Sequence, residues 1–383
     1  MPIFTKPLPI SLYVHIPWCI SKCPYCDFNS HAVKDNLPET LYVDTLLNEF
    51  LHYLPYVGNR SLVSIFFGGG TPSLFSGASI KRILTTLNEY IDFDSTIEIT
   101  LEANPGTTDQ ARFNDFREAG INRLSLGVQS FHNDKLKRLG RIHEGSHALK
   151  AIAQAKEAGF EQINIDLMYA LPNQTLTETL QDLETALAFK PSHLSWYQLT
   201  IEPNTLFYKQ RPTLPNDELS WEMQLAGQSL LLEHAYQQYE VSAYAQNNQF
   251  CKHNLNYWEF GDYIGIGAGA HGKITQLDTG IVERFAQIRH PKDYLNTSKR
   301  RFTPQTTLLK NDLIFEFMLN ALRLTNGFRG QLFEERTGLS LETIQPILKT
   351  AKRQGLLIEN ENIICPSLQG KQFLNNLISH FLN

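Results

Sequence analysis

Three cysteines in one short loop constrain this chain more than any other feature. Cys19, Cys23 and Cys26 follow a C-x3-C-x2-C spacing in the run from Tyr13 to Phe28. Such spacing lets three thiolates converge on one inorganic centre, whereas a cubane iron–sulfur cluster held only by cysteine takes four. The loop therefore predicts a cluster with one iron left open to a ligand that is not protein.

Structural zinc is the first alternative, because His15, Asp27 or His31 could complete a tetrahedral ligand set. Zinc ribbons, however, usually combine two C-x2-C pairs, and the remaining cysteines, Cys251 and Cys365, are isolated. Three unrelated buried cysteines are the second alternative. A disulfide framework is excluded by the odd cysteine count and by the size of the chain. We favour the iron–sulfur cluster.

Composition narrows the class of protein. A net charge of −5 and a pI near 6.2 argue against nucleic acid as a partner. No apolar run approaches the ~18 residues that a membrane span needs, and residues 1–9 lack the apolar region of a signal peptide. We therefore expect a cytoplasmic protein, whose thiols stay reduced and can hold a cluster.

Short β-branched runs alternate with longer amphipathic stretches from Leu12 onward, the pattern of a parallel sheet with crossover helices. The expected strands are 12–16, 63–67, 97–101, 123–127, 162–168 and 193–199. The expected helices are 37–54, 79–90, 108–119, 143–158 and 175–189. These units predict an α/β fold, either a partial (β/α)6 barrel or an open sheet.

The alternation of predicted strands and helices ends after about residue 205, and we divide the 383 residues into three parts. Residues 1–205 form the partial barrel, residues 206–305 an extension and residues 306–383 a C-terminal mixed, mainly helical winged-helix-like domain. The extension carries a linker at 212–216, a helix at 217–238, a strand at 239–244 and a glycine-rich segment at 265–272. The last domain lacks a strong basic stripe, so we expect a packing or lid role rather than DNA binding.

Polar and glycine-rich segments follow or lie within the predicted strands. They are the cysteine loop after the first strand, 68–72 after the second, 102–106 after the third, 127–130 after the fourth and Asp166 in the fifth. Reactive groups gather at the carboxyl ends of parallel strands, so we expect these residues around one mouth. The three consecutive glycines at 68–70 would allow a ligand close to the backbone.

The run from Tyr13 to Cys26 matches Y-x-H-x-P-[FW]-C-x3-C-x-[YF]-C. In this motif, and onward to at least Gly272, the chain resembles the radical S-adenosylmethionine (radical SAM) proteins of the oxygen-independent coproporphyrinogen III oxidase-like family. The resemblance implies a radical SAM barrel, a [4Fe-4S] cluster on the three cysteines and S-adenosylmethionine at the open iron.

The resemblance also implies cofactor contacts. They come from Tyr13, Tyr25, Gly69, Gly70, Thr71, Glu102, Gln129, Arg141 and Asp166. Taken singly, several have plainer roles: the glycines could form a turn, Glu102 could cap a strand end, Arg141 could sit in a solvated ion pair, and Asp166 could be a buried structural carboxylate.

Two functions within this family must be separated. The oxidase removes two propionate carboxyls by hydrogen abstraction, and its motif carries a further cysteine just after the third ligand, where this chain has Phe28. The chain also starts twelve residues before Tyr13, so we expect the oxidase's long N-terminal extension to be absent. Both departures resemble the HemW-type haem chaperones, which bind haem and deliver it to acceptor proteins. A methyl or sulfur transferase is disfavoured because no further cysteine cluster is present.

A second motif supports the chaperone. The run from His253 to Trp258 matches the H-N-x-x-Y-W signature of the HemW type, associated there with haem. Neutral imidazole is a good iron ligand, and aromatic rings such as Tyr257 and Trp258 offer a flat apolar wall. The alternatives are that Asn254 caps a turn, that both rings belong to the core, or that Cys251 is the iron ligand.

The partners implied are haem and a haem-acceptor protein, with membrane-associated respiratory proteins as one acceptor class. A donor to such proteins would be cytoplasmic and would meet the membrane only at its periphery.

Overall fold

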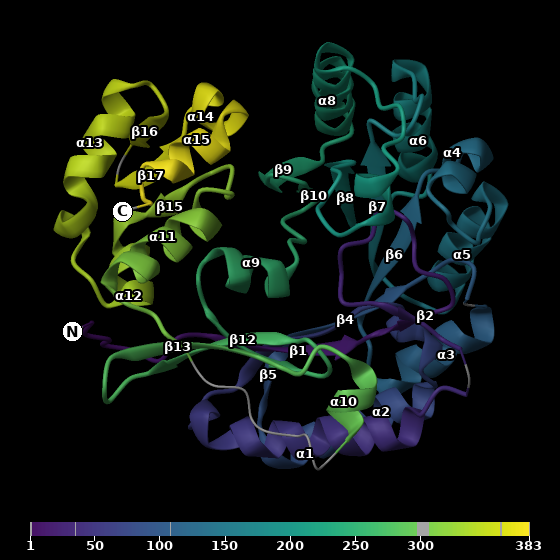
Figure 1. Cartoon of the computed structure of the whole chain (residues 1–383), viewed down its shortest axis with the longest axis horizontal. Helices are drawn as coiled ribbons and strands as arrows, with labels where there is room; N and C mark the ends of the chain where they lie inside the picture. Colours follow the sequence, from purple (N-terminus) through teal and green to yellow (C-terminus); the bar gives the residue numbers. More distant parts are fainter. Residues whose placement is uncertain (1, 35, 108, 297–305, 361, 383) are drawn as a thin grey trace.

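The computed structural model describes residues 2–34, 36–107, 109–296, 306–360 and 362–382 (Figure 1). Within these residues the main sheet has twelve strands. In spatial order they are β14 (Thr306–Thr307), β13 (Ile281–Ala286), β12 (His271–Gln276), β11 (Asp262–Ile266), β1 (Ile10–Ile16), β4 (Leu62–Gly69), β5 (Phe93–Ala103), β6 (Arg123–Gln129), β7 (Gln162–Tyr169), β8 (His193–Gln198), β10 (Ala243–Ala245) and β9 (Gln237–Glu240).

The six predicted strands form β1 and β4 to β8, which lie side by side in chain order and run parallel. Helices cover the outer face of this curved sheet (Figure 1). They are α1 (Glu39–Val57), α2 (Gly77–Tyr90), α3 (Gln110–Ala119), α4 (Asn133–Arg138), α5 (Gly145–Glu157), α6 (Leu176–Ala188) and α8 (Asp217–Glu233). The partial barrel is thus confirmed; α4 was not predicted.

Local sequence explains where these helices begin and end. Thr175 accepts a hydrogen bond from the backbone of Glu178, and the Glu178 carboxylate accepts one from the backbone of Thr175, so a capping box starts α6. Gly120 ends α3 with φ of 111°, a left-handed conformation that glycine adopts without strain.

The predicted strand at 239–244 is wrong in detail. The chain turns at Val241 and Ser242, so the segment forms two strands, β9 and β10, which pair antiparallel with each other. The helix expected at 217–238 ends at Glu233, because Ala235 takes a φ of +61° and β9 begins at Gln237.

Residues 206–296 add strands to both edges of the barrel. At one edge β10 pairs antiparallel with β8. At the other β11 pairs parallel with β1, and β12 and β13 follow antiparallel. Between them lies α9 (Lys252–Trp258), a short helix that faces the open side of the barrel (Figure 1).

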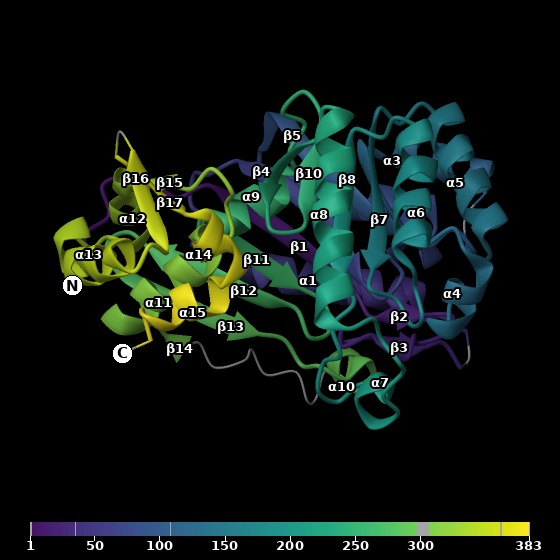
Figure 2. The same ribbon diagram turned by 90° about the horizontal axis from the view of Figure 1, so that it is seen from above.

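The C-terminal part packs around a second apolar core, to which Phe260 and Val282 of the extension also belong. It contains α11 (Lys310–Ala321), β15 (Phe328–Arg329), α12 (Gly330–Thr337), α13 (Gln345–Arg353), β16 (Leu357–Asn360), β17 (Ile363–Pro366), α14 (Leu368–Gln372) and α15 (Leu374–Ser379). The strands β16 and β17 pair antiparallel as a hairpin, and Phe373 separates the two short helices α14 and α15. Figure 2 shows this part on the side away from α4 to α6. Thr325 N donates to Tyr239 O at 3.0 Å, which joins it to β9.

Candidate functional site

One cavity of about 590 Å³ brings the predicted site residues together. Its wall includes the three cysteines and every predicted cofactor contact: Cys19, Cys23, Cys26, Tyr13, Tyr25, Gly69, Gly70, Thr71, Glu102, Gln129, Arg141, Asp166, His253, Asn254, Tyr257 and Trp258. Residues from β1, β4, β5, β6, β7, the cysteine loop and α9 thus share one space, as expected from the carboxyl ends of parallel strands.

The cysteine loop is fixed at both ends by the short strands β2 (Trp18–Cys19) and β3 (His31–Ala32), which pair with each other. All three thiols are free. Burial raises the pKa of Cys19 to about 11 and also raises the pKa of Cys26, whose Sγ lies 3.4 Å from Ser30 Oγ. A bound metal would favour the thiolates that burial disfavours.

This donor set fits an iron–sulfur cluster, since three unpaired thiols of one loop line one cavity. In the described part of the chain, no group of three His, Cys, Asp or Glu side chains is arranged to hold a metal ion. A cluster spreads its thiolates around several irons, so it does not need them gathered around one ion. Arg141 Nη1 lies 3.7 Å from Cys23 Sγ and places a positive charge beside the loop.

The glycines at the end of β4 have a packing reason that the sequence did not reveal. A Cβ on Gly69, whose φ is +117°, would lie 2.5 Å from the His15 ring, and a Cβ on Gly70 would lie 2.5 Å from Trp18 O. The space that we expected for a ligand is thus also needed by β1 and the cysteine loop. Thr71 N donates to Trp18 O at 2.7 Å and ties the two loops together.

Two carboxyl groups lie deep in the cavity wall. Glu102 accepts a hydrogen bond from Gly69 N at 3.1 Å, and burial together with the nearby charge of Asp166 raises the pKa of Glu102 to about 8. Asp166 accepts hydrogen bonds from Ser125 Oγ at 3.1 Å and Asn164 Nδ2 at 2.7 Å, while burial raises its pKa. These buried groups can bind hydroxyl or ammonium groups of a ligand.

Gln129 ends β6 with φ of +71°, in a region where a non-glycine residue is uncommon. The pairing of β6 with β7 shifts register between Gly127 and Gln129. The Gln129 Oε1 atom accepts a hydrogen bond from Tyr197 OH at 2.9 Å, so the amide is held against the cavity wall. Such a conformation persists only where its surroundings fix it.

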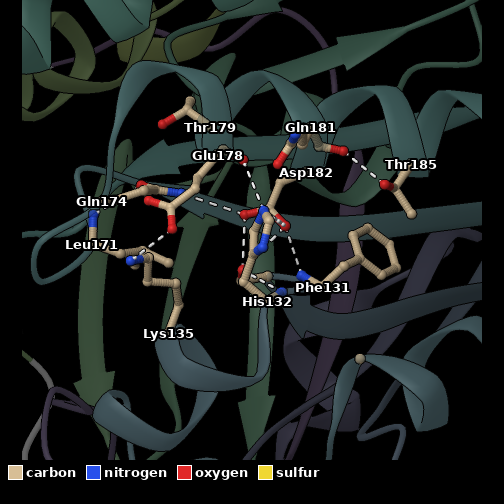
Figure 3. Close-up of polar contacts among 12 residues, drawn as sticks. Phe131, His132, Lys135, Leu171, Gln174, Glu178, Thr179, Gln181, Asp182 and Thr185 are labelled. Carbon is tan, nitrogen blue, oxygen red and sulfur yellow. Dashed lines mark hydrogen bonds and ion pairs between the residues drawn. The ribbon is translucent and has the colours of Figure 1, made fainter.

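Figure 3 shows the polar contacts around Asp182, which hold the chain directly after Gln129 in place. Asp182 of α6 accepts hydrogen bonds from Ser130 Oγ at 2.8 Å and from Phe131 N at 2.6 Å. Gln174 Nε2 donates to the same carboxyl at 3.3 Å. The two residues after Gln129 are therefore anchored to the helix behind the sheet.

Two side-chain nitrogens of the predicted site are buried without a hydrogen-bond partner among the described residues. They are the guanidinium Nε of Arg141 and the indole Nε1 of Trp258. Arg141 is otherwise fixed by its Nη2, which donates to Gly127 O at 2.6 Å. Among the described residues Arg141 has no carboxylate partner and its side chain lines the cavity, so a solvated ion pair does not account for its position. Buried donors without partners are uncommon and suit a ligand that brings acceptors.

His253 of α9 lies in a defined orientation. Its Nδ1 is 3.0 Å from Ser64 Oγ, and Ser64 donates its own proton to Ser11 Oγ at 2.7 Å. Nδ1 therefore carries the imidazole proton, which leaves the lone pair on Nε2. Burial lowers the pKa of His253 to about 4, so the ring is neutral at physiological pH.

The rest of the H-N-x-x-Y-W motif forms a half-buried wall. The Tyr257 and Trp258 rings lie edge to face with centroids 5.1 Å apart. The guanidinium of Arg323 covers the Trp258 ring at 4.4 Å. Asn254 lies inside α9 and does not cap it, because the N-cap position is Cys251.

Cys251 is not placed as a metal ligand. It is fully buried, its Sγ donates to Glu98 Oε1 at 3.3 Å, and burial raises its pKa to about 12. It does not line the cavity.

Several further residues that were not predicted as site residues also line the cavity, among them Arg123, Ser125, Asn164, Ser195, Tyr197 and Glu240. A signal was present. In β6, Leu124, Leu126 and Val128 are buried among apolar side chains, whereas Arg123, Ser125 and Gly127 line the cavity. Strands covered by helices normally read as continuous apolar runs, so polar residues at every second position indicate a polar interior.

Comparison with known proteins places these features in context. The Radical SAM superfamily matches residues 13–186, and the HemN C-terminal domain matches residues 308–373. The heme chaperone HemW of Haemophilus influenzae is 49% identical to this chain over 98% of both chains. The heme chaperone HemW of Escherichia coli is 48% identical, again over 98% of both chains. That of Bacillus subtilis is 35% identical over 97% of this chain and 99% of its own.

A solved structure, the radical SAM enzyme coproporphyrinogen III oxidase (HemN) from Escherichia coli, is similar in fold. Its TM-score is 0.81 with 23% identity, over 98% of this chain and 90% of that one.

Proposed function

Because this chain belongs to the HemW family of haem chaperones within the radical SAM superfamily, we propose that it binds haem and passes it to acceptor proteins. One observation carries this proposal. His253, Asn254, Tyr257 and Trp258 line the same cavity as Cys19, Cys23 and Cys26, although the two motifs lie more than 220 residues apart, from 26 to 253.

The cysteines would hold a [4Fe-4S] cluster, with S-adenosylmethionine beside it. Such a cluster, when bound, supplies an open iron and one electron for the sulfonium of that cofactor. Within the protein, Glu102 and Asp166 would bind polar groups of the cofactor, and Arg141 would bind an anionic group beside Cys23. Gln129 would present its backbone and amide at the end of β6.

Haem would lie against the wall of α9. The lone pair of His253 Nε2 is available to iron, and the Tyr257 and Trp258 rings can pack against a porphyrin face. The extension at 206–305 thus contributes the haem wall, and residues 306–383 buttress it through Arg323.

We place the protein in the cytoplasm, with acceptors that include membrane-associated respiratory proteins. Among the described residues, no helix combines the length and the apolar character that a membrane crossing requires.

The test is an anaerobic haem titration of the reconstituted protein, followed by the Soret band. Saturable binding, and transfer to an apo-acceptor, are expected. The same protein incubated with coproporphyrinogen III, reductant and S-adenosylmethionine should form no protoporphyrinogen. Formation of protoporphyrinogen would contradict the chaperone function and would identify the protein as the oxidase.

A further inference from the structure

Arg123 is a buried charge in the cavity wall that the proposed site does not use. It is the first residue of β6, only 3% exposed, and it lines the cavity together with Ser125 and Asn164. An arginine is almost never buried so fully without a paired group. The groups around Arg123 should therefore include partners for its positive charge.

The groups around Arg123 satisfy its guanidinium only in part. Arg123 Nε has no hydrogen-bond partner in the described chain. The closest acidic oxygen, Glu98 Oε2, is 3.8 Å from Nε, and Thr100 Oγ1 is 3.5 Å from Nη1. A guanidinium offers five donors in a planar fork that suits a carboxylate with two oxygens. Most of this capacity is unused.

Glu98 is engaged elsewhere. Its two oxygens accept hydrogen bonds from Lys252 N at 3.0 Å, His253 N at 3.1 Å and Cys251 Sγ at 3.3 Å. The carboxylate therefore caps the N-terminus of α9, where an anion is stabilised. It balances the charge of Arg123 at a distance without forming the close fork that arginine and carboxylate usually adopt.

We infer that Arg123 binds a carboxylate of the ligand held in this cavity, and that this carboxylate is a propionate of haem. The inference rests on the proposed haem binding. Haem is a flat apolar ring with two carboxylates on short arms, so an aromatic wall with a buried cation beside it matches both of its parts. Glu98 contacts the His253 backbone and lies beside Arg123, so the iron-binding imidazole and the guanidinium belong to one wall.

S-adenosylmethionine is the other source of a carboxylate. Its position at the cluster favours Arg141, which lies 3.7 Å from Cys23 Sγ. Arg123 instead lies at the first residue of β6, the end opposite Gln129. The two arginines are thus divided between the two ligands.

The experiment compares haem with haem dimethyl ester, in the same detergent, on the wild-type protein and on Arg123→Lys. Arg112→Lys is the control, because Arg112 bonds to Ser73 O and does not line the cavity. Wild type should bind the ester at least about tenfold more weakly than haem, as expected for a lost charge-assisted bond. Arg123→Lys should lose a similar factor for haem and little for the ester.

Equal wild-type affinity for haem and ester would overturn the inference, and so would an equal loss for both ligands in Arg123→Lys. Loss of S-adenosylmethionine binding with haem binding retained would assign the carboxylate to that cofactor instead. If Arg123→Lys does not fold, the wild-type comparison alone decides. A wild type that binds neither haem nor ester contradicts the proposed function itself, a result distinct from all of these.

Discussion

Asp182 and Ser130 are joined by a buried hydrogen bond of 2.8 Å from the Ser130 hydroxyl to the Asp182 carboxylate. Ser130 directly follows Gln129, the residue whose backbone takes a φ of +71° at the cavity wall. A helix behind the sheet therefore supports the shape of the site without touching the cavity.

Replacement of Asp182 by Ala should damage both stability and cofactor binding. The Ser130 hydroxyl and Phe131 N–H would lose their acceptor in a buried place, which costs roughly 2–4 kcal/mol of unfolding free energy. Gln129 would relax, and the affinity for S-adenosylmethionine should fall. Denaturant unfolding and equilibrium dialysis measure the two effects. Glu184→Ala, at an exposed position of the same helix, should change neither.

Asp182 should also make stability depend on pH. Burial raises its pKa to about 6, above the usual value for aspartate. A carboxyl group with a raised folded-state pKa stabilises most when protonated, so its contribution is full below about pH 4 and declines as the pH rises through 6. In the Asp182→Asn variant, the unfolding free energy should depend less on pH between pH 4 and 7. His132 and Glu178 lie near the same carboxyl group. A pH slope that is the same in wild type and Asp182→Asn would contradict this role of Asp182.

Binding of S-adenosylmethionine should become tighter between about pH 7 and 9. The pKa of Glu102 is raised to about 8, so the free protein holds this carboxyl protonated at pH 7. A ligand that donates hydroxyl or ammonium protons prefers the carboxylate, hence its affinity rises as Glu102 ionises. Glu102→Gln should weaken binding and remove this dependence. Calorimetry at several pH values tests it, and a pH-independent wild type would contradict the role.

The sequence predicted the barrel because each strand and helix carries its own local pattern. The cysteine loop and the strand-end residues followed from topology, since parallel strands end at one edge. Gln129 was found as a site residue, but its positive φ was not. That conformation depends on Asp182, more than 50 residues away, from 129 to 182.

Other features depend on contacts that a local pattern cannot encode. β9 and β10 separate where the chain turns at Val241, and β9 then bonds to Leu324 of the C-terminal part. Arg123 looked like an ordinary charged residue at the start of a strand. Only the surrounding strands reveal that its side chain is turned inward and buried.

Serine at Cys19, Cys23 or Cys26 should abolish the brown absorption of the reconstituted cluster. A hydroxyl is a poorer ligand than thiolate for these irons, and three thiols leave no spare donor. Anaerobic absorption spectra after reconstitution measure the loss. Cys365→Ser is the matched control, because Cys365 lies in β17 and its thiol bonds to Thr325 O. Retained absorption in all three loop variants would remove the cluster from this loop.

Replacement of His253 by Ala should weaken haem binding and shift the Soret maximum, because the variant lacks the imidazole that would bind iron. The pKa of His253 is lowered to about 4, so the wild-type ring stays neutral and its haem affinity should change little from pH 6 to 8. His234→Ala, at an exposed position after α8, provides the control. The Ser64→Ala variant keeps the imidazole but removes the hydroxyl that holds Nδ1. It should alter the Soret maximum and lower the unfolding free energy by roughly 1–3 kcal/mol, because Nδ1–H loses a buried acceptor. Spectra identical in wild type and His253→Ala would leave the imidazole a structural group, held between Ser64 and the Phe66 ring at 5.0 Å.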